Sequence, residues 1–184
     1  MVIFNVKDDN TEKTFELALE KAKALGTDVV LATTTGKTAL RFLDAAEKAG
    51  FAGRTVIVTH AYGSREKGKN IMPEDVRARL IASGAAVVTA AHALSGGERG
   101  ISSRFQGTYP LELIAHTLRM ISAGTKVCVE IGAMALDAGA IEYGKPVICI
   151  GGTGGGADTA CVVTPSYSSS LMESHINEFL CKPY

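Results

Sequence analysis

Short apolar runs alternate with amphipathic segments along most of this chain, and this alternation is the strongest constraint on its fold. The runs predict strands over residues 28–32, 55–59, 86–89, 146–150 and 160–164. Apolar side chains spaced by three and four residues predict helices over residues 11–25, 36–50, 73–83, 109–123, 126–138 and 170–180. Residues 126–129 are equally compatible with the start of a strand, and a helix is our preferred interpretation. Helices between strands place the strands parallel, so the pattern predicts an α/β protein.

The order of these elements predicts a three-layer α/β/α domain with about five strands. A short glycine-rich segment joins the last two strands, so we expect the last strand to lie antiparallel at an edge of the sheet. No linker or repeat divides residues 1–184, which predicts a single domain. Ligands bind beyond the carboxyl ends of the parallel strands in such sheets. The expected binding site therefore consists of residues 33–38, 60–70, 90–107 and 151–158.

Charge and composition disfavour several classes of partner. Nineteen basic and nineteen acidic side chains give zero formal net charge, which removes the positive field expected of a nucleic-acid or anionic-membrane binder. No apolar run approaches the roughly 20 residues that span a bilayer, and the first residues do not resemble a signal peptide, so we expect a cytoplasmic protein. The four cysteines lie apart, without CxxC pairs, which predicts neither disulfides nor a metal site. We therefore expect a small-molecule partner.

The turn between the first predicted strand and the next helix has the composition of an anion site. Its six residues are Thr33, Thr34, Thr35, Gly36, Lys37 and Thr38. The first amides of a helix point outward with the positive end of its dipole, Gly36 permits close backbone approach, and Lys37 adds a charge. Helix capping alone would need only one threonine. A P-loop nucleotidase is disfavoured, because its motif requires glycine where this chain has Leu31. The turn thus predicts that the protein binds a phosphorylated small molecule.

Residues 33–39 resemble the phosphate-binding turn of the pyruvate kinase C-terminal domain, where a strand runs into a Thr-x-Ser/Thr-Gly-Arg/Lys-Ser/Thr-Ala motif. The strand predicted over 55–59 also falls at that family's spacing. The likeness covers nearly the whole chain as a fold and is motif-specific over residues 29–59, whereas the catalytic barrel of the kinase has no counterpart. The chain therefore resembles a stand-alone pyruvate kinase C-terminal-domain-like protein of the archaeal type. Relatives of that type look like binders of flavin mononucleotide (FMN), so the resemblance implies FMN as the ligand.

A glycine-rich loop follows the strand predicted over residues 146–150. Its candidate binding residues are Gly152, Thr153, Gly154, Gly155 and Asp158. A dinucleotide-type Gly-x-Gly-x-x-Ala pattern is formally present, but a strand follows it instead of a helix, so that motif fails its structural context. A plain hairpin would need fewer glycines. We therefore expect the loop to face the ligand and to donate its amides to flavin carbonyls or to a second acidic group.

Two histidines lie just beyond predicted strands, His60 after residues 55–59 and His92 after residues 86–89. Either imidazole can exchange a proton, hydrogen-bond a heterocycle, or simply bond to loop backbone. The other candidates in these two loops are Tyr62, Gly63, Ser95 and Arg104. We expect residues 90–107 to be a long loop that closes over the ligand.

Glu130 and Asp137 lie on one face of the helix predicted over residues 126–138. We interpret them as the polar margin of its apolar stripe and not as an acid and base pair. No catalytic residue is assigned from the sequence. The functions that stay open are an FMN-binding protein with a flavin-dependent redox role, a non-catalytic sugar-phosphate or nucleotide effector module, and a phosphatase-like enzyme that uses His60 or His92. The apolar helices over 109–138 also make a homodimer plausible.

Overall fold

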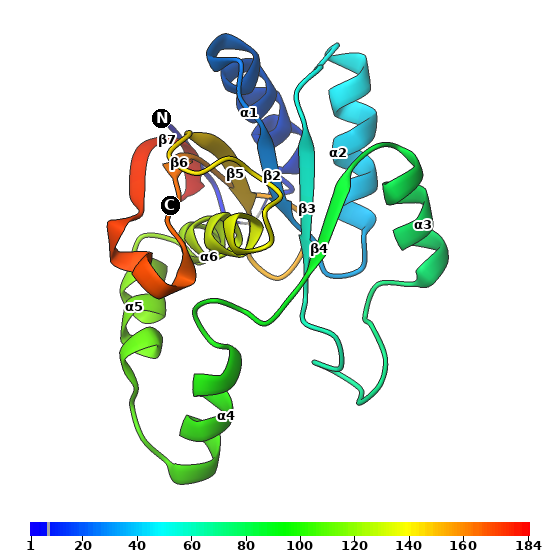
Figure 1. Cartoon of the computed structure of the whole chain (residues 1–184). Coiled ribbons are helices and arrows are strands. Elements are labelled where there is room, and N and C mark those ends of the chain that lie inside the picture. The colour runs from blue at the N-terminus through cyan, green and yellow to red at the C-terminus, as the bar shows by residue number, and fades with distance from the viewer. Residues whose placement is uncertain (7) are drawn as a thin grey trace.

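A mixed sheet runs through the centre of the protein (Figure 1). The computed structural model describes residues 1–6 and 8–184. Within them, seven strands pair in the order β1-β7-β6-β5-β2-β3-β4. The strands are β1 (Val2–Phe4), β2 (Val29–Ala32), β3 (Thr55–Thr59), β4 (Ala86–Thr89), β5 (Val147–Gly151), β6 (Thr159–Thr164) and β7 (His175–Pro183).

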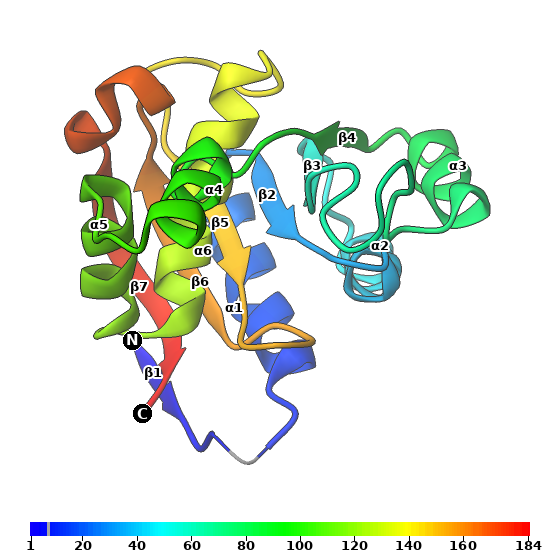
Figure 2. The same cartoon turned by 90° about the horizontal axis from the view of Figure 1, so that it is seen from below.

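Strands β5, β2, β3 and β4 are parallel neighbours, as the alternation of strands and helices predicted. Strand β6 is antiparallel to β5, as its short connection predicted. It does not form the edge, however, because β7 pairs antiparallel with β6 and β1 pairs parallel with β7. The described sheet therefore has two more strands than the sequence predicted, and both chain ends lie at its β1–β7 end (Figure 2).

Helices cover both faces of the sheet, which confirms the predicted α/β class (Figure 1). They are α1 (Thr11–Leu25), α2 (Lys37–Lys48), α3 (Glu74–Ala82), α4 (Gly96–Phe105), α5 (Pro110–Arg119), α6 (Ala123–Asp137) and the 3-10 helix η1 (Ser168–Glu173). Helices α1, α2 and α3 share one hydrophobic cluster with the sheet, and α6 packs on the opposite face. Helix α5 then lies over the outer side of α6.

The parallel strands at the centre of the sheet are buried on both faces. Every residue of β3 and β5 is buried, as expected for parallel strands that helices cover on each side. On the face that carries α1 and α2, the rings of Phe15 and Phe42 are fully buried and meet edge to face, with centroids 5.2 Å apart. This contact fixes α2, and the first turn of α2 belongs to the expected anion site.

Residues 90–107 were predicted to be a loop, and the structure corrects this, because α4 occupies Gly96–Phe105. Three glycines lower the intrinsic helix propensity of this segment. Tertiary hydrogen bonds compensate: Oγ of Ser102 donates to Glu112 (2.6 Å), and the Glu112 amide donates to Glu98 (3.1 Å). Helix α4 is thereby tied to the start of α5.

Residues 170–180 were predicted to be a helix, and this was wrong. The segment contains η1 and then strand β7. Strand β7 has β6 on one side and β1 on the other, so its backbone groups are satisfied by two partners. The short strand β1 was not predicted, and without it the pairing potential of β7 could not be recognised.

The helix over residues 126–138 is confirmed, and it begins earlier than predicted, at Ala123. Ser122 caps it, because its Oγ accepts the amide of Thr125 (2.9 Å). The helix predicted over residues 109–123 ends earlier, at Arg119, and Gly124 lies in the first turn of α6, where a Cβ would collide with Thr159. In the described part of the chain, no helix combines the length and the apolar composition needed to cross a membrane.

Replacement of Phe15 by Ala is expected to lower the free energy of unfolding by about 3 to 5 kcal/mol, because it removes a fully buried ring and leaves a cavity beside Phe42. Leu25→Ala, at an exposed position of the same helix, is the matched control and is expected to change stability by less than about 1 kcal/mol. Urea denaturation measures both. Equal losses in the two variants would contradict the packing described here.

Candidate functional site

The turn between β2 and α2 is fixed at both of its ends. The amide of Thr33 donates to the carbonyl of Val58 on β3 (3.0 Å), and the amide of Gly36 donates to Oγ1 of Thr33 (3.1 Å). Gly36 has φ +87°, and a Cβ at this position would collide with Val76. Glycine is therefore required here both by the backbone conformation and by close packing.

The same turn presents unused hydrogen-bond donors. Thr34, Thr35 and Lys37 are exposed, and within residues 1–6 and 8–184 their side chains have no hydrogen-bond or ion-pair partner. The first turn of α2 contains no acidic residue, and its leading amides have no partner within the helix. Amide donors, hydroxyls and one ammonium thus converge at the positive end of a helix dipole, which is the arrangement that binds a phosphate.

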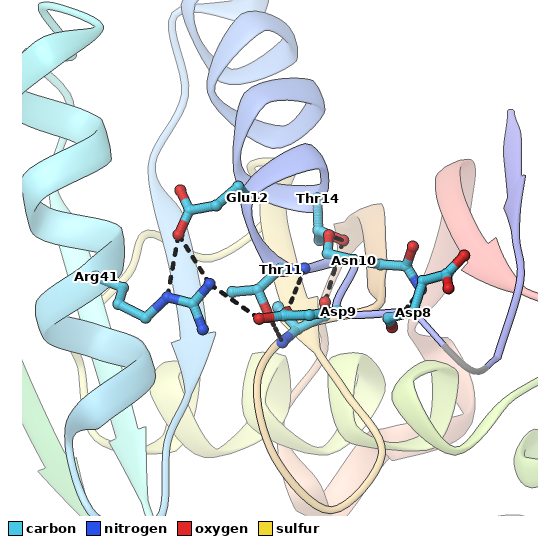
Figure 3. A network of polar contacts seen from close by, with 8 residues as sticks. Asp8, Asp9, Asn10, Thr11, Glu12, Thr14 and Arg41 are labelled. Carbon is cyan, nitrogen blue, oxygen red and sulfur yellow. Dashed lines mark hydrogen bonds and ion pairs between the residues drawn. The ribbon is translucent and has the colours of Figure 1, made fainter.

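A second polar network joins the start of α1 to α2 (Figure 3). The guanidinium of Arg41 donates to Glu12 (3.0 Å) and to Asp9 (3.3 Å), and Asp9 accepts the amide of Thr11 (3.1 Å). The hydrogen bonds from Thr11 and the charge of Arg41 together hold the pKa of Asp9 below its ordinary value. Arg41 therefore already has two carboxylate partners, whereas Lys37 does not.

Close packing explains several glycines of the loop between β5 and β6. A Cβ at Gly151 would lie 2.8 Å from the carbonyl of Gly124 on α6, and one at Gly156 would collide with Thr11 on α1. A Cβ at Gly152 would lie 2.7 Å from the carbonyl of Gly156 within the loop itself. At Gly154, which has φ +74°, a Cβ would meet no described atom within 4 Å. The glycines at the base of the loop thus serve packing, and its exposed tip is the part open to a ligand.

Asp158 closes this loop. Its two carboxylate oxygens accept the amide of Thr153 (3.0 Å) and the hydroxyl of Thr159 (2.7 Å). Of the residues predicted in this loop, Thr153, Gly154 and Gly155 form the exposed tip. Asp158 has the structural role of holding that tip.

The structure brings His60 and His92 together. Nε2 of His92 lies 3.1 Å from Nδ1 of His60, and their ring centroids are 4.8 Å apart. Nδ1 of His92 lies 3.3 Å from Oε2 of Glu130. The other oxygen of Glu130 accepts the amide of Leu94 (3.1 Å), and Lys126 forms an ion pair with Oε2. A polar chain therefore runs from the core side of α6 to the carboxyl edge of β3.

Burial and charge set the ionisation of this chain. Burial by itself would raise the pKa of Glu130, but the hydrogen bond from His92 and the charge of Lys126 outweigh it and lower that pKa to about 2. Burial lowers the pKa of Lys126 in spite of the carboxylate beside it. Burial, followed by the neighbouring His92, also lowers the pKa of His60. Near neutral pH, Glu130 is therefore a carboxylate and His60 is a neutral imidazole.

Glu130 and Lys126 were missed as site residues. The interpretation of Glu130 as a polar margin was wrong, because its side chain is only 3% exposed, whereas Asp137 is exposed as that interpretation required. The signal that could have identified the pair is a Lys and a Glu four residues apart on a helix that is otherwise apolar.

The other predicted residues lie further from this chain. Tyr62 is exposed and donates to the carbonyl of Gly68 (3.0 Å), while Gly63, with φ +74°, donates its amide to Lys69 (2.9 Å). Ser95 lies at the start of α4. Arg104 lies near the other end of α4, about 13 Å further along the helix axis, and within the described residues no hydrogen bond or ion pair joins it to the histidines.

Two clefts in the described part of the chain lie away from this edge. One, of about 640 Å³, lies along α1 and α2, with Glu16 and Lys48 in its wall. The other, of about 690 Å³, lies between α2 and residues near the amino ends of β3 and β4. None of the predicted site residues lines either cleft. The candidate site, which consists of loops at the carboxyl edge of the sheet, therefore coincides with neither cleft.

Comparison with known protein families matches residues 12–163 to the family described as pyruvate kinase, alpha/beta domain. The match covers the turn after β2, both histidines and the glycine-rich loop.

Gly36→Ala is expected to be more destabilising than Gly26→Ala. Both glycines have positive φ, so both substitutions incur the left-handed backbone cost of about 1 to 2 kcal/mol. Only at Gly36 does the added methyl group collide with Val76, which is expected to add about 1 to 3 kcal/mol. Chemical denaturation of the two variants measures the difference, and equal stabilities would show that the turn does not pack on α3 as described.

Glu130→Gln is expected to cost about 3 to 5 kcal/mol of stability at neutral pH, because it leaves the charge of Lys126 buried without its partner. Glu16→Gln, which removes an exposed ion pair with Lys13, is the control and is expected to cost less than about 1 kcal/mol.

The advantage of the wild type over Glu130→Gln is also expected to depend on pH. The pKa of this carboxyl is about 2 in the folded protein and 4.5 ordinarily, so its contribution is complete above pH 4.5 and is lost as the pH falls toward 2. Urea denaturation of both proteins over this range tests the prediction. A stability difference that does not change with pH would contradict it.

Proposed function

Because this chain belongs to the pyruvate kinase alpha/beta domain family, we propose that it binds a phosphorylated small molecule, FMN, at the carboxyl edge of its sheet. The phosphate occupies the turn over residues 33–38. The observation that carries this proposal is the set of unpartnered donors there, above all Lys37 and the first amides of α2. The first turn of α2 contains no acidic residue, and exposed threonines lie beside Lys37. A lysine that served only solubility would not require these neighbours.

FMN is the ligand that the stand-alone relatives suggest, and the residues present fit it. The turn over residues 33–38 would hold its phosphate, and the exposed amides of Gly154 and Gly155 are donors for the ring carbonyls. Tyr62, which is 63% exposed and lies two residues after His60 in the sequence, is an aromatic side chain that can cover a flat ring. Bound flavin would supply electron transfer, and the protein would supply binding and orientation.

We also propose a cytoplasmic location, which agrees with four free, buried cysteines among the described residues. A homodimer stays a proposal. The apolar circumference of α6 is already covered by the sheet and by α5, so the surface that supports a dimer is reduced to the exposed apolar side chains Leu113, Met120 and Ile121 near α5.

Lys37→Ala is expected to weaken FMN binding by about 1.5 to 3 kcal/mol, because it removes a charged hydrogen bond to the phosphate. Lys48→Ala is the matched control, since Lys48 is an exposed lysine at the opposite end of the same helix. Its affinity is expected to equal that of the wild type. Isothermal calorimetry measures all three proteins, and equal affinities would show that Lys37 is only a solvated charge.

The identity of the ligand is tested on the untagged protein as purified. The visible spectrum and mass spectrometry of any molecule released on denaturation are expected to identify FMN. A colourless protein that cannot be reconstituted with FMN but binds a sugar phosphate would favour the non-catalytic effector module. A flavin that neither accepts electrons from nicotinamide donors nor passes them on would retain the ligand and remove the redox role.

A further inference from the structure

The hydrogen-bond chain from Lys126 to His60 has a defined direction. Glu130 is ionised and can only accept, so Nδ1 of His92 carries the proton that is donated to it. When His92 carries no second proton, its Nε2 has a lone pair, which accepts the Nδ1 proton of His60. In this arrangement Nε2 of His60 is left with a lone pair. Within the described residues no hydrogen-bond partner lies at that nitrogen.

Burial distinguishes this chain from surface histidines that bond to a loop. Glu130 and Lys126 are 3% and 6% exposed, and the His60 ring is half-buried at the carboxyl edge. Stability of the fold explains the buried ion pair between Lys126 and Glu130 and the hydrogen bond from the Leu94 amide to Glu130. They do not explain why the chain continues through two imidazoles to the edge of the sheet, where it ends in a free nitrogen.

The free nitrogen belongs to a residue that emerges beside the phosphate turn. Ala32 on β2 and Val58 on β3 are the last paired residues of these two strands. Thr34 and His60 each lie two residues beyond this pair. Neighbouring strands lie about 4.8 Å apart, so the two loops leave the sheet side by side. A molecule anchored by its phosphate at residues 33–38 therefore has His60 close to its next functional group.

We propose that His60 is a general base toward the phosphorylated molecule bound at the turn, and that His92 and Glu130 are positioning residues that fix its proton and its orientation. The inference rests on the proposed function, because the turn must hold the molecule. The ligand class is a phosphate monoester with an N–H or O–H group near its phosphate, which in FMN is a ribityl hydroxyl. The proton moves from that group to Nε2 of His60, and the electron pair of the broken N–H or O–H bond stays on the ligand. Transfer of the proton in the reverse direction restores the ligand group and the neutral His60.

The charges that face His60 agree with this role. His92, Lys126 and Arg65 disfavour a positive His60, whereas Glu130 favours it. A proton accepted at Nε2 can be shared through Nδ1 with His92, next to the carboxylate of Glu130. Two positive rings 3.1 Å apart would repel, so the pair is expected to accept one proton at a time.

Nitrogen-15 NMR of the full-length protein tests the chain without any ligand. The protein has four histidines, and the exposed His116 and His175 provide reference signals in the same spectrum. At neutral pH we expect His60 and His92 to carry their protons on Nδ1. His92→Gln is expected to shift the nitrogen signals of His60, because it removes the ring that accepts the His60 Nδ1 proton, whereas His116→Gln is expected to leave the His60 signals in place. Protons on Nε2 of both rings, or no response of His60 to His92→Gln, would overturn the relay.

Addition of FMN to the same sample tests the use of the relay. As calorimetry shows FMN occupying the site, the Nε2 signal of His60 is expected to move toward the chemical shift of a hydrogen-bonded or protonated nitrogen. The signals of His116 and His175 are expected to stay unchanged. Binding that depends on Lys37 but leaves His60 unchanged would overturn this inference and leave the proposed function standing. Failure of both FMN and a panel of sugar phosphates to bind would overturn the proposed function and this inference together.

Discussion

The buried carboxylate of Glu130 is the interaction on which the arrangement of the candidate site depends. A negative charge in the interior needs partners, and here they come from three places: Lys126 on α6, the amide of Leu94, and His92. Leu94 and His92 belong to the loop after β4, so one side chain ties that loop to α6. His92 in turn contacts His60 after β3. The carboxylate of Glu130 thus fixes the loops after β3 and β4 relative to each other.

Around this fixed point, the carboxyl edge of the sheet divides into two chemically different parts. The turn over residues 33–38 is rich in donors and carries a lysine without a carboxylate partner in the described residues. The histidine pair next to it presents a neutral ring with a free lone pair. Arg41 lies one helical turn beyond Lys37 and is neutralised by the carboxylates of Asp9 and Glu12. On α2, the cation near the turn that has no carboxylate partner is therefore Lys37, which favours an anchored anion with a proton acceptor beside it.

Sequence patterns predicted the parts of the fold that local chemistry determines. The parallel strands, helix α1 and the turn around Gly36 follow from periodicity and from the needs of a strand-to-helix turn. Helix α4 was missed because its glycines disfavour a helix until Glu112 and Glu98 hold it against α5. Strand β7 was missed because its partners, β1 and β6, come from opposite ends of the chain. Glu130 was missed because a charged residue is normally solvated, and only the folded protein shows the groups that neutralise it.

The central claim is that a phosphate group binds at the start of α2. A two-dimensional amide NMR titration of the full-length protein with FMN tests this most directly. The largest shifts are predicted at the amides of Lys37 and Thr38, because these donors of the first turn of α2 have no partner within the helix. Shifts confined to the cleft along α1 and α2, around Glu16 and Lys48, would place the ligand elsewhere and contradict the account.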